Sequence, residues 1–190
     1  MQLPFPVGQT WQANGPHPHN GVSGTRNSVD LGKTDNTTGT VVAVAAGTVS
    51  RLTNCGGGYE IRIDHASGWQ SGYYHLASAS IAKGDKVSMG QKIGTTGQGC
   101  GSATFKHVHF SLRRNGTDVN IDGLNIGGHT VRAKSYNYGG YWIRNSDGAR
   151  VAEDAGGYAR CCLKSLAVTN DDPRGHYDLA SSPEAGRVRV

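Results

Sequence analysis

The sequence predicts an all-β protein of antiparallel sheets with little helix. Of its 190 residues 29 are glycine, and Gly, Thr, Ser, Asn and Val dominate, which is typical of short strands joined by tight turns. No long segment repeats its apolar residues at the helical period, whereas several short segments alternate apolar and polar residues as strands do. Hydrophobic residues make up only 36% of the chain, so we expect a small core.

The first part of the chain contains loops and two expected strand regions. Residues 1–14 form an extended lead-in, and residues 15–21, rich in Gly and Pro, form a rigid loop that carries two histidines. Residues 27–31 form a short strand with one acidic residue. Residues 39–52 are rich in Val, Ala and Thr and predict one or two buried strands, with a bend at Gly47.

The middle of the chain gives the clearest strand patterns. Residues 59–65 alternate apolar and polar side chains, and a turn leads from them into a further strand over residues 69–76. Residues 81–97 contain short strands separated by Gly-containing turns. A strand over residues 104–112 follows, and Asn115-Gly116 predicts a two-residue hairpin turn after it.

The domain is expected to span residues 1–150. Residues 151–190 are polar, with only brief apolar pieces, and predict an atypical, weakly ordered tail.

Charge and cysteine content limit the partners and the compartment. The net charge is +5 and the isoelectric point is near 9.1, which favours an anionic partner. Arg and Lys are scattered singly, without the basic run expected of a nucleic-acid-binding β-barrel, and a negatively charged cell envelope is an equally good partner, so charge alone does not decide between the two. No apolar run is long enough to span a membrane, and the first residues lack signal-peptide features. Cys55 and Cys100 lie in Gly-rich loops without metal-binding spacing, which suits an oxidising compartment.

A His-x-His pattern is the most informative chemical feature. At the two-residue period of a strand, Val108, Phe110 and Leu112 point to one face, and His107 and His109 point to the other. An apolar face that packs on a core leaves both imidazoles on the opposite side, where they could bind a metal and transfer a proton. The alternative is a surface strand with two solvated histidines.

A catalytic zinc needs three protein ligands and an open position. His109 could supply one, and His17 and Asp30 are the strongest candidates for the other two. Each of them also has a simpler interpretation, a solvated loop histidine and a turn or cap residue. His19 lies two residues from His17 and could replace it as the ligand.

Several motifs, in order and in register, resemble the M23 family of zinc metallopeptidases, and in particular its secreted β-lytic and staphylolysin-like members. The similarity covers roughly residues 10–145. The matching segments are Gly15-Pro16-His17, Asn27-Ser28-Val29-Asp30, residues 39–49, Gly72-Tyr73-Tyr74-His75, Lys83-Gly84-Asp85, residues 90–94 and residues 107–112.

The resemblance implies a fold and roles for the histidines. It implies antiparallel sheets that form an open groove with the zinc site, and one catalytic Zn²⁺ held by His17, Asp30 and His109. His107 and His75 would lie beside the metal as general base and as donor to the developing oxyanion. His17 is preferred to His19 because the family's ligand follows the Gly-Pro pair directly.

The resemblance also implies that a tyrosine contacts the substrate, either Tyr138 or Tyr136, and that Cys55 pairs with Cys100. The adjacent residues Cys161-Cys162 cannot bridge each other without strain, and the chain has no earlier cysteine for the family's C-terminal pairing.

Some residues depart from the family's pattern or have no expected role. Phe105-Lys106 replaces the Gly-Pro that often precedes the His-x-His of family members. His65, His129 and His176 are expected to be solvated or structural.

These observations predict a secreted zinc endopeptidase in its mature form, without signal or propeptide. By resemblance its substrate is the peptide part of bacterial peptidoglycan, such as Gly-containing cross-bridges or stem peptides. The alternatives are a non-catalytic cell-wall-binding or scaffold member of the same fold, and an endopeptidase for Gly-rich proteins such as elastin. A monomer is the default expectation.

Overall fold

The computed structural model describes residues 1–19, 26–101, 103–154, 156 and 160–168. Within these ranges the regular structure is β, apart from one short 3-10 turn at Ala66–Gly68, which confirms the predicted fold class. In the same part of the chain, no helix has the length and apolar character needed to cross a membrane.

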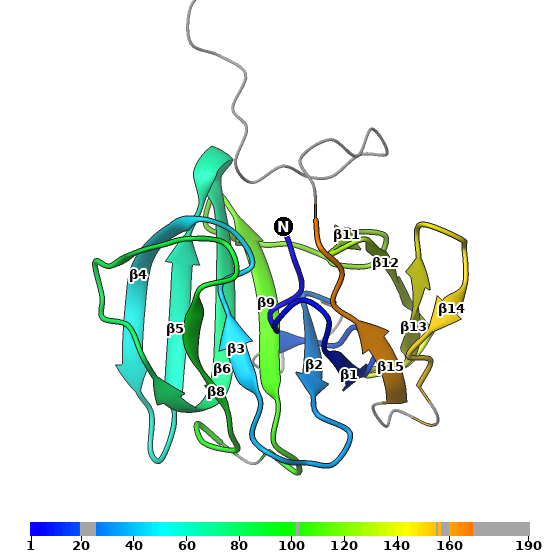
Figure 1. Ribbon diagram of the computed structural model, residues 1–190, viewed down its shortest axis with the longest axis horizontal. Helices are drawn as coiled ribbons and strands as arrows, with labels where there is room; N and C mark the ends of the chain where they lie inside the picture. The colour runs from blue at the N-terminus through cyan, green and yellow to red at the C-terminus, as the bar shows by residue number, and fades with distance from the viewer. Residues whose placement is uncertain (20–25, 102, 155, 157–159, 169–190) are drawn as a thin grey trace, which may run out of the picture.

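The main sheet has eleven strands, and all its neighbouring strands are antiparallel. Its principal order is β15-β1-β2-β9-β6-β5-β4-β7, with β10 beside β9 and with β8 joining β3 to β6. Figure 1 shows this path from β4 at the left to β15 at the right. The strands are β1 (Thr10–Ala13), β2 (Ser28–Gly32), β3 (Thr40–Val42), β4 (Gly47–Asn54), β5 (Tyr59–Asp64), β6 (Trp69–Ala79), β7 (Lys86–Val87), β8 (Lys92–Thr96), β9 (Val108–Arg114), β10 (Thr117–Asp118) and β15 (Arg160–Lys164).

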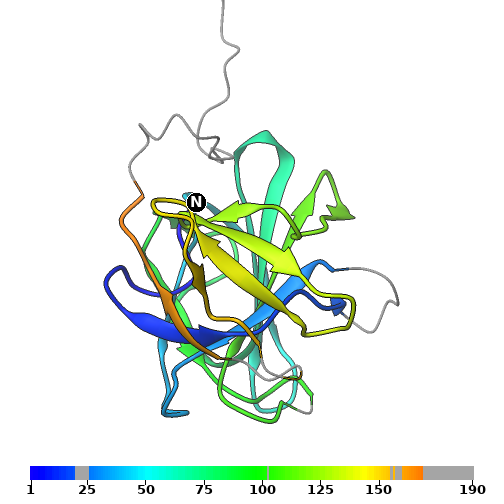
Figure 2. The same cartoon turned by 90° about the vertical axis from the view of Figure 1, so that its right-hand side faces the viewer.

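A second antiparallel sheet of four strands has the order β11-β12-β13-β14. It lies beyond the β15 edge of the main sheet in Figure 1 and faces the viewer in Figure 2. Its strands are β11 (Asn125–Ile126), β12 (His129–Ala133), β13 (Gly140–Arg144) and β14 (Arg150–Val151).

Local sequence explains several of these elements. The alternating segment 59–65 forms β5, and segment 39–52 forms β3 and most of β4, with Gly47 as the first residue of β4. Asn115 and Gly116 have φ values of 49° and 80°, and they connect β9 to β10 as the two-residue hairpin turn that was predicted. Positive φ at both central positions matches the twist of the flanking strands, and Asn and Gly tolerate it best.

The core lies against the apolar face of β9. Val108, Phe110 and Leu112 are fully buried, together with Val29 and Leu31 of the adjacent β2. Each of these side chains stabilises the fold by roughly 1.5–3 kcal/mol relative to an exposed position. Because alternate residues face the core, the other side of β9 is left for His109 and its polar neighbours.

Both ends of the described chain belong to this sheet. Leu3 and Phe5 are fully buried although they precede β1, and Phe5 stacks on Trp11 with ring centroids 4.5 Å apart. Strand β15 lies within the segment that the sequence analysis assigned to a tail, yet it pairs with β1, and its Leu163 is fully buried. Residues 169–190 of that segment lie outside the described residues.

The structure joins Cys161 to Cys162 in β15, and the peptide bond between them is cis.

Candidate metal centre

The candidate metal centre lies where β2, β9 and β6 run side by side. Asp30 of β2 pairs with His109 of β9, and His109 pairs with Tyr74 of β6, so one row across three strands points to the same face. His17 reaches this row from the preceding loop because its backbone forms a two-way bridge with Ser28. The His17 N–H donates to the Ser28 carbonyl (3.0 Å), and the Ser28 N–H donates to the His17 carbonyl (3.2 Å).

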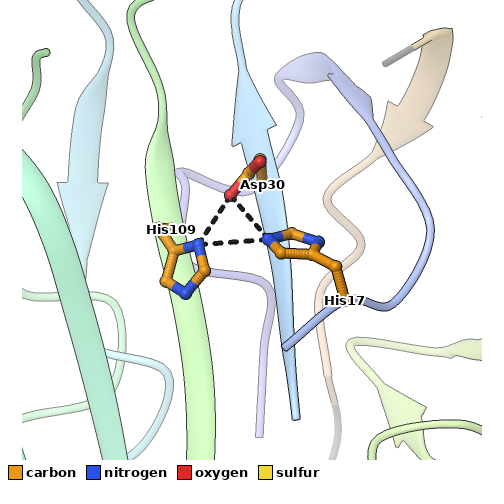
Figure 3. Close-up of side chains that lie close together, drawn as sticks. All are labelled: His17, Asp30 and His109. Carbon is orange, nitrogen blue, oxygen red and sulfur yellow. Dashed lines mark hydrogen bonds and ion pairs between the residues drawn. The ribbon is translucent and has the colours of Figure 1, made fainter. Parts of the chain in front are cut away.

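Three side-chain atoms converge at this point, as Figure 3 shows. His17 Nε2 lies 3.3 Å from Asp30 Oδ1 and 3.2 Å from His109 Nδ1, and His109 Nδ1 lies 2.8 Å from Asp30 Oδ1. All three residues are buried, with exposed fractions of 1%, 6% and 8% for His17, Asp30 and His109. The structure therefore brings together the three residues that the sequence analysis selected as metal ligands.

The outward-facing atoms of this cluster are held by other groups. His17 Nδ1 lies 3.1 Å from the Gly15 carbonyl oxygen, to which it can only donate, so Nε2 is the ring atom left to bind a metal. Asn14 contacts the acid twice: its Nδ2 donates to Asp30 Oδ2 (2.9 Å), and its Oδ1 accepts from the Asp30 backbone N–H (2.8 Å). These contacts aim the Nε2 lone pair of His17 and Oδ1 of Asp30 at the centre.

The electrostatics of the cluster keep the acid ionised. Burial alone would raise the pKa of Asp30. The charge of His17 and the hydrogen-bonding contacts with His107, His109 and His17 outweigh burial, and they hold the pKa well below its usual value. Burial lowers the pKa of His109 despite its hydrogen bond to Asp30. A carboxylate beside two imidazoles is a donor set that suits a divalent cation.

A β-bulge places His75 at the site. Tyr74 and His75 of β6 together lie opposite the single residue Glu60 of β5, and His75 has a φ of 64°. The extra residue re-aims the strand, so that neighbouring side chains are not sent to opposite faces. As a result the ring centroids of Tyr74 and His75 lie 5.7 and 5.8 Å from that of His109.

His107 lies beside the centre. Its Nε2 is 3.4 Å from Asp30 Oδ1, its Nδ1 donates to the Phe105 carbonyl (2.8 Å), and its ring centroid is 4.8 Å from that of His75. Burial lowers the pKa of His107, but the hydrogen bond and the charge of Asp30 outweigh burial, so the pKa is raised above its usual value.

His75 is held by the loop that carries the disulfide between Cys55 and Cys100, the pairing that the resemblance implies. His75 Nδ1 donates to the carbonyl of Gly99, the residue before Cys100 (2.6 Å). Burial is the main reason that the pKa of His75 is lowered, with a further contribution from His107. The two flanking histidines thus have pKa values that are shifted in opposite directions.

The two candidate tyrosines differ in their contacts. The Tyr138 ring stacks on His17 with centroids 3.9 Å apart, and the Tyr138 carbonyl accepts the Gly15 N–H (2.8 Å). The Tyr136 hydroxyl donates to Asp154 Oδ2 (2.8 Å). Tyr138 therefore lies against the candidate centre, while the hydroxyl of Tyr136 is engaged elsewhere.

Residues around the centre include some that the sequence analysis did not select. Asn14 and Tyr74 are among them. Tyr74 lies in the matching segment Gly72-Tyr73-Tyr74-His75, from which only His75 was selected, and Asn14 lies outside the matching segments. His19 was weighed as a rival to His17, but its Nδ1 lies 2.9 Å from Nε2 of His109, on the far side of that ring from the centre. Burial, followed by the charge of His109, lowers the pKa of His19 to about 3.

Two of the histidines without an expected role are structural rather than solvated. His65 and His129 have exposed fractions of 9% and 1%, so exposure to solvent, one of the two expectations for them, is wrong. His65 bonds to the Ala46 carbonyl and to the Ser71 hydroxyl, and His129 bonds to the Gly127 carbonyl. His176 lies outside the described residues.

The donor set fits zinc. In a tetrahedral site with bonds of about 2.0–2.1 Å, neighbouring ligand atoms lie about 3.3 Å apart. The observed separations of 2.8, 3.2 and 3.3 Å are at or slightly below this value. A buried carboxylate and two imidazoles, with two further histidines alongside, define the class of protein, within the described residues, as one with a candidate His/Asp metal site.

Comparisons with known proteins identify the family. The model of peptidase family M23 matches residues 24–121. Protease LasA of Pseudomonas aeruginosa is 35% identical over 149 residues, which cover 73% of this chain and 35% of LasA. The β-lytic metalloendopeptidase of Lysobacter enzymogenes is 30% identical over 150 residues, which cover 73% of this chain and 82% of that enzyme. This chain belongs to peptidase family M23, as its motifs predicted.

A solved structure and a further relative extend the comparison. The M23 metalloprotease pseudoalterin, from the deep sea, superposes with a TM-score of 0.68 at 25% identity, covering 87% of this chain and 96% of pseudoalterin. The peptidoglycan DD-endopeptidase ShyA of Vibrio cholerae is 35% identical over 109 residues, which cover 57% of this chain and 23% of ShyA. The chain thus spans about a third of LasA and less than a quarter of ShyA.

Proposed function

We propose that this chain is a zinc metalloendopeptidase that hydrolyses peptide bonds of bacterial peptidoglycan. The observation that carries the proposal is the convergence of His17 Nε2, Asp30 Oδ1 and His109 Nδ1, which all lie within 4.8 Å of one another in a buried position. These atoms would hold one zinc ion. When bound, the zinc supplies Lewis acidity, which polarises a peptide carbonyl and makes a water molecule more acidic.

The flanking histidines have the properties of a base and an acid. In both rings Nδ1 donates to a backbone carbonyl, of Gly99 for His75 and of Phe105 for His107, so Nε2 is the atom left to exchange a proton. The pKa of His75 is lowered by burial, and that of His107 is raised by Asp30. In this proposal His75 removes the proton of the attacking water, and His107 donates to the departing amine or to the oxyanion.

Tyr138 is the tyrosine that we assign to the substrate. Its ring packs on His17, whereas the Tyr136 hydroxyl already donates to Asp154. A phenol hydroxyl beside the centre can donate to a carbonyl oxygen as negative charge develops on it.

Three observations support a cell-wall substrate outside the cytoplasm. The name of one relative is peptidoglycan DD-endopeptidase, and the net charge of +5 favours an anionic wall. The disulfide between Cys55 and Cys100 suits an oxidising compartment. Within peptidoglycan we propose Gly-containing cross-bridges or stem peptides as the cleaved segments.

The test measures zinc content and the release of amino groups from purified Gram-positive cell walls. We expect one zinc per chain and cleavage for the wild type, no zinc and no cleavage for His17→Ala, and zinc without cleavage for His107→Ala. A wild type that binds no zinc and cleaves nothing at any pH would overturn the proposal in favour of the scaffold alternative.

The substrate is tested separately, by competition between pentaglycine-bridged wall fragments and soluble elastin. Preferential cleavage of the wall fragments supports the proposed substrate. Preferential cleavage of elastin would keep the peptidase and replace its substrate with Gly-rich proteins.

A further inference from the structure

His19 makes the closest polar contact with the outward-facing side of the His109 ring among the described residues. Its Nδ1 lies 2.9 Å from His109 Nε2, and it is buried, with an exposed fraction of 9%. The inner side of the same ring presents Nδ1 to Asp30 and His17. The two nitrogens of His109 therefore have separate partners.

The tautomer of His109 decides whether the ring can bind a metal. A neutral imidazole carries one proton, and the nitrogen that holds it cannot be a ligand. For His109 Nδ1 to offer a lone pair to the centre, the proton must be on Nε2, and the partner of Nε2 must then accept a hydrogen bond. His19 Nδ1 stands in the position of that acceptor.

We propose that His19 is a positioning residue that fixes the Nε2–H tautomer and the ring orientation of His109 and thereby strengthens zinc binding. The proposal rests on the proposed function. Hydrogen-bond partners on the far side of a ligating histidine set its orientation and basicity in metal sites.

His19 is itself held in place, as a positioning residue must be. Its backbone N–H donates to Asn27 Oδ1 (2.8 Å), and its ring packs against Tyr74 with centroids 4.1 Å apart. Pro18 precedes it and restricts the backbone between His17 and His19. In this proposal His19 therefore supports the ligand His109 and is not itself a metal ligand.

The proton assignment extends to the other nitrogen of His19. If Nδ1 accepts from His109, the His19 proton lies on Nε2. That nitrogen is buried, and the described residues offer it no hydrogen-bond partner. The only hydrogen-bond contact of the His19 ring in this part of the chain is thus the one to His109.

Two substitutions of His19 distinguish the contribution of its hydrogen-bond acceptor from that of its ring packing. His19→Phe keeps an aromatic ring against Tyr74 and removes the acceptor, while His19→Asn keeps an acceptor, Oδ1, near the position of Nδ1 and removes the ring. His129→Phe is the matched control, since His129 is a buried histidine on β12, away from the candidate metal centre, whose Nδ1 bonds to the Gly127 carbonyl. Zinc affinity is measured on the whole chain by competition with a chromophoric chelator.

The proposal predicts that His19→Phe weakens zinc binding by about 10- to 100-fold, the usual effect of removing such a partner. His19→Asn and His129→Phe should each remain within about threefold of the wild type, well below that range. Visible spectra of the cobalt-substituted proteins should show an altered ligand field for His19→Phe alone.

Each outcome has a distinct meaning. If the wild type binds no zinc, the proposed function fails, and this inference fails with it. If the wild type binds zinc and His19→Phe binds it equally well, only the inference is overturned. Equal losses in His19→Phe and His19→Asn would also overturn it, because ring packing and not the acceptor would then matter.

Discussion

The main sheet contains two buried polar clusters that differ in one respect. In the first, which we call the hydroxyl network, hydrogen bonds connect the Val44 N–H, the Tyr73 and Ser71 hydroxyls, His65 and the Ala46 carbonyl. Each polar side chain in it, His65, Ser71 and Tyr73, has a protein partner. This network holds β5 and β6 to the loop before β4 and requires nothing from outside.

The candidate metal centre has the opposite arrangement. Its outer atoms are satisfied by protein, but His17 Nε2, Asp30 Oδ1 and His109 Nδ1 converge on one point, 2.8–3.3 Å from one another. Converging acceptors in a buried position repel unless a cation or shared protons lie between them. The comparison teaches that burial and polarity alone do not mark a functional site. The convergence of several potential metal ligands on one point does.

The largest difference is expected between removing a ligand from the candidate metal centre and removing a histidine from the hydroxyl network. His109→Ala should lose the zinc, and its activity should fall by at least about a thousandfold, since metal ions contribute several kcal/mol and 1.36 kcal/mol is a factor of ten. His65→Gln should keep one zinc per chain. Atomic absorption and wall-cleavage rates measure both. Zinc loss in His65→Gln would remove the distinction between the clusters.

The next effect concerns a residue beside the centre that binds no metal. His75→Asn should keep zinc and lose about 10²–10⁴ in kcat, the usual range for a general base. Asn is the suitable replacement because it tolerates the positive φ of 64° at this position better than most residues. A melting temperature like that of the wild type serves as the folding control. Unchanged kcat would exclude His75 as the base.

The two candidate tyrosines should differ in their effect on kcat, and this effect should be smaller than that of His75. Tyr138→Phe keeps the ring on His17 and removes only the hydroxyl, so kcat should fall by about 10- to 100-fold, below the loss for a full oxyanion donor, with zinc retained. Tyr136→Phe breaks the hydrogen bond to Asp154 and should leave kcat within about twofold of the wild type, because that hydroxyl already has a partner. The reverse ranking of the two variants would transfer the role to Tyr136.

The smallest effect is the pH dependence of the hydroxyl network. Burial lowers the folded-state pKa of His65 from 6.5, so at pH values below about 6.5 the unfolded chain binds more protons than the folded one. The stability that neutral His65 contributes is complete above this pH and decreases as the pH falls. In denaturant titrations of both proteins, the decline in unfolding free energy below pH 6.5 should be shallower for His65→Gln than for wild type. Equal slopes would contradict the assignment.

Much of the fold could be predicted because it depends on local patterns. The alternation in β5 and β9 and the Asn115-Gly116 turn are properties of adjacent residues, and the structure has them. The strand expected over residues 104–112, however, begins only at Val108 and continues to Arg114, and His107 joins the sheet through an isolated bridge to Gly97. The place of β15 could not be predicted. A short, mostly polar strand becomes part of the sheet only through its long-range pairing with β1, more than 145 residues earlier, and through burial of Leu163.

The candidate site shows the same division. The sequence selected His17, Asp30 and His109 through motifs, and the cross-strand register places them together. Strict alternation would send Tyr74 and His75 to opposite faces, and only the bulge opposite Glu60 brings both rings near His109. Bulges and second-layer contacts depend on partner strands, and nothing in a single segment encodes them.

The account's central claim is that one zinc ion binds where the lone pairs converge. Crystals grown with equimolar zinc and measured on both sides of the zinc absorption edge test this most directly. The account predicts one anomalous peak within about 2.0–2.2 Å of His17 Nε2, Asp30 Oδ1 and His109 Nδ1. A peak bonded to His19 in place of His17, or no peak at this position, would contradict it.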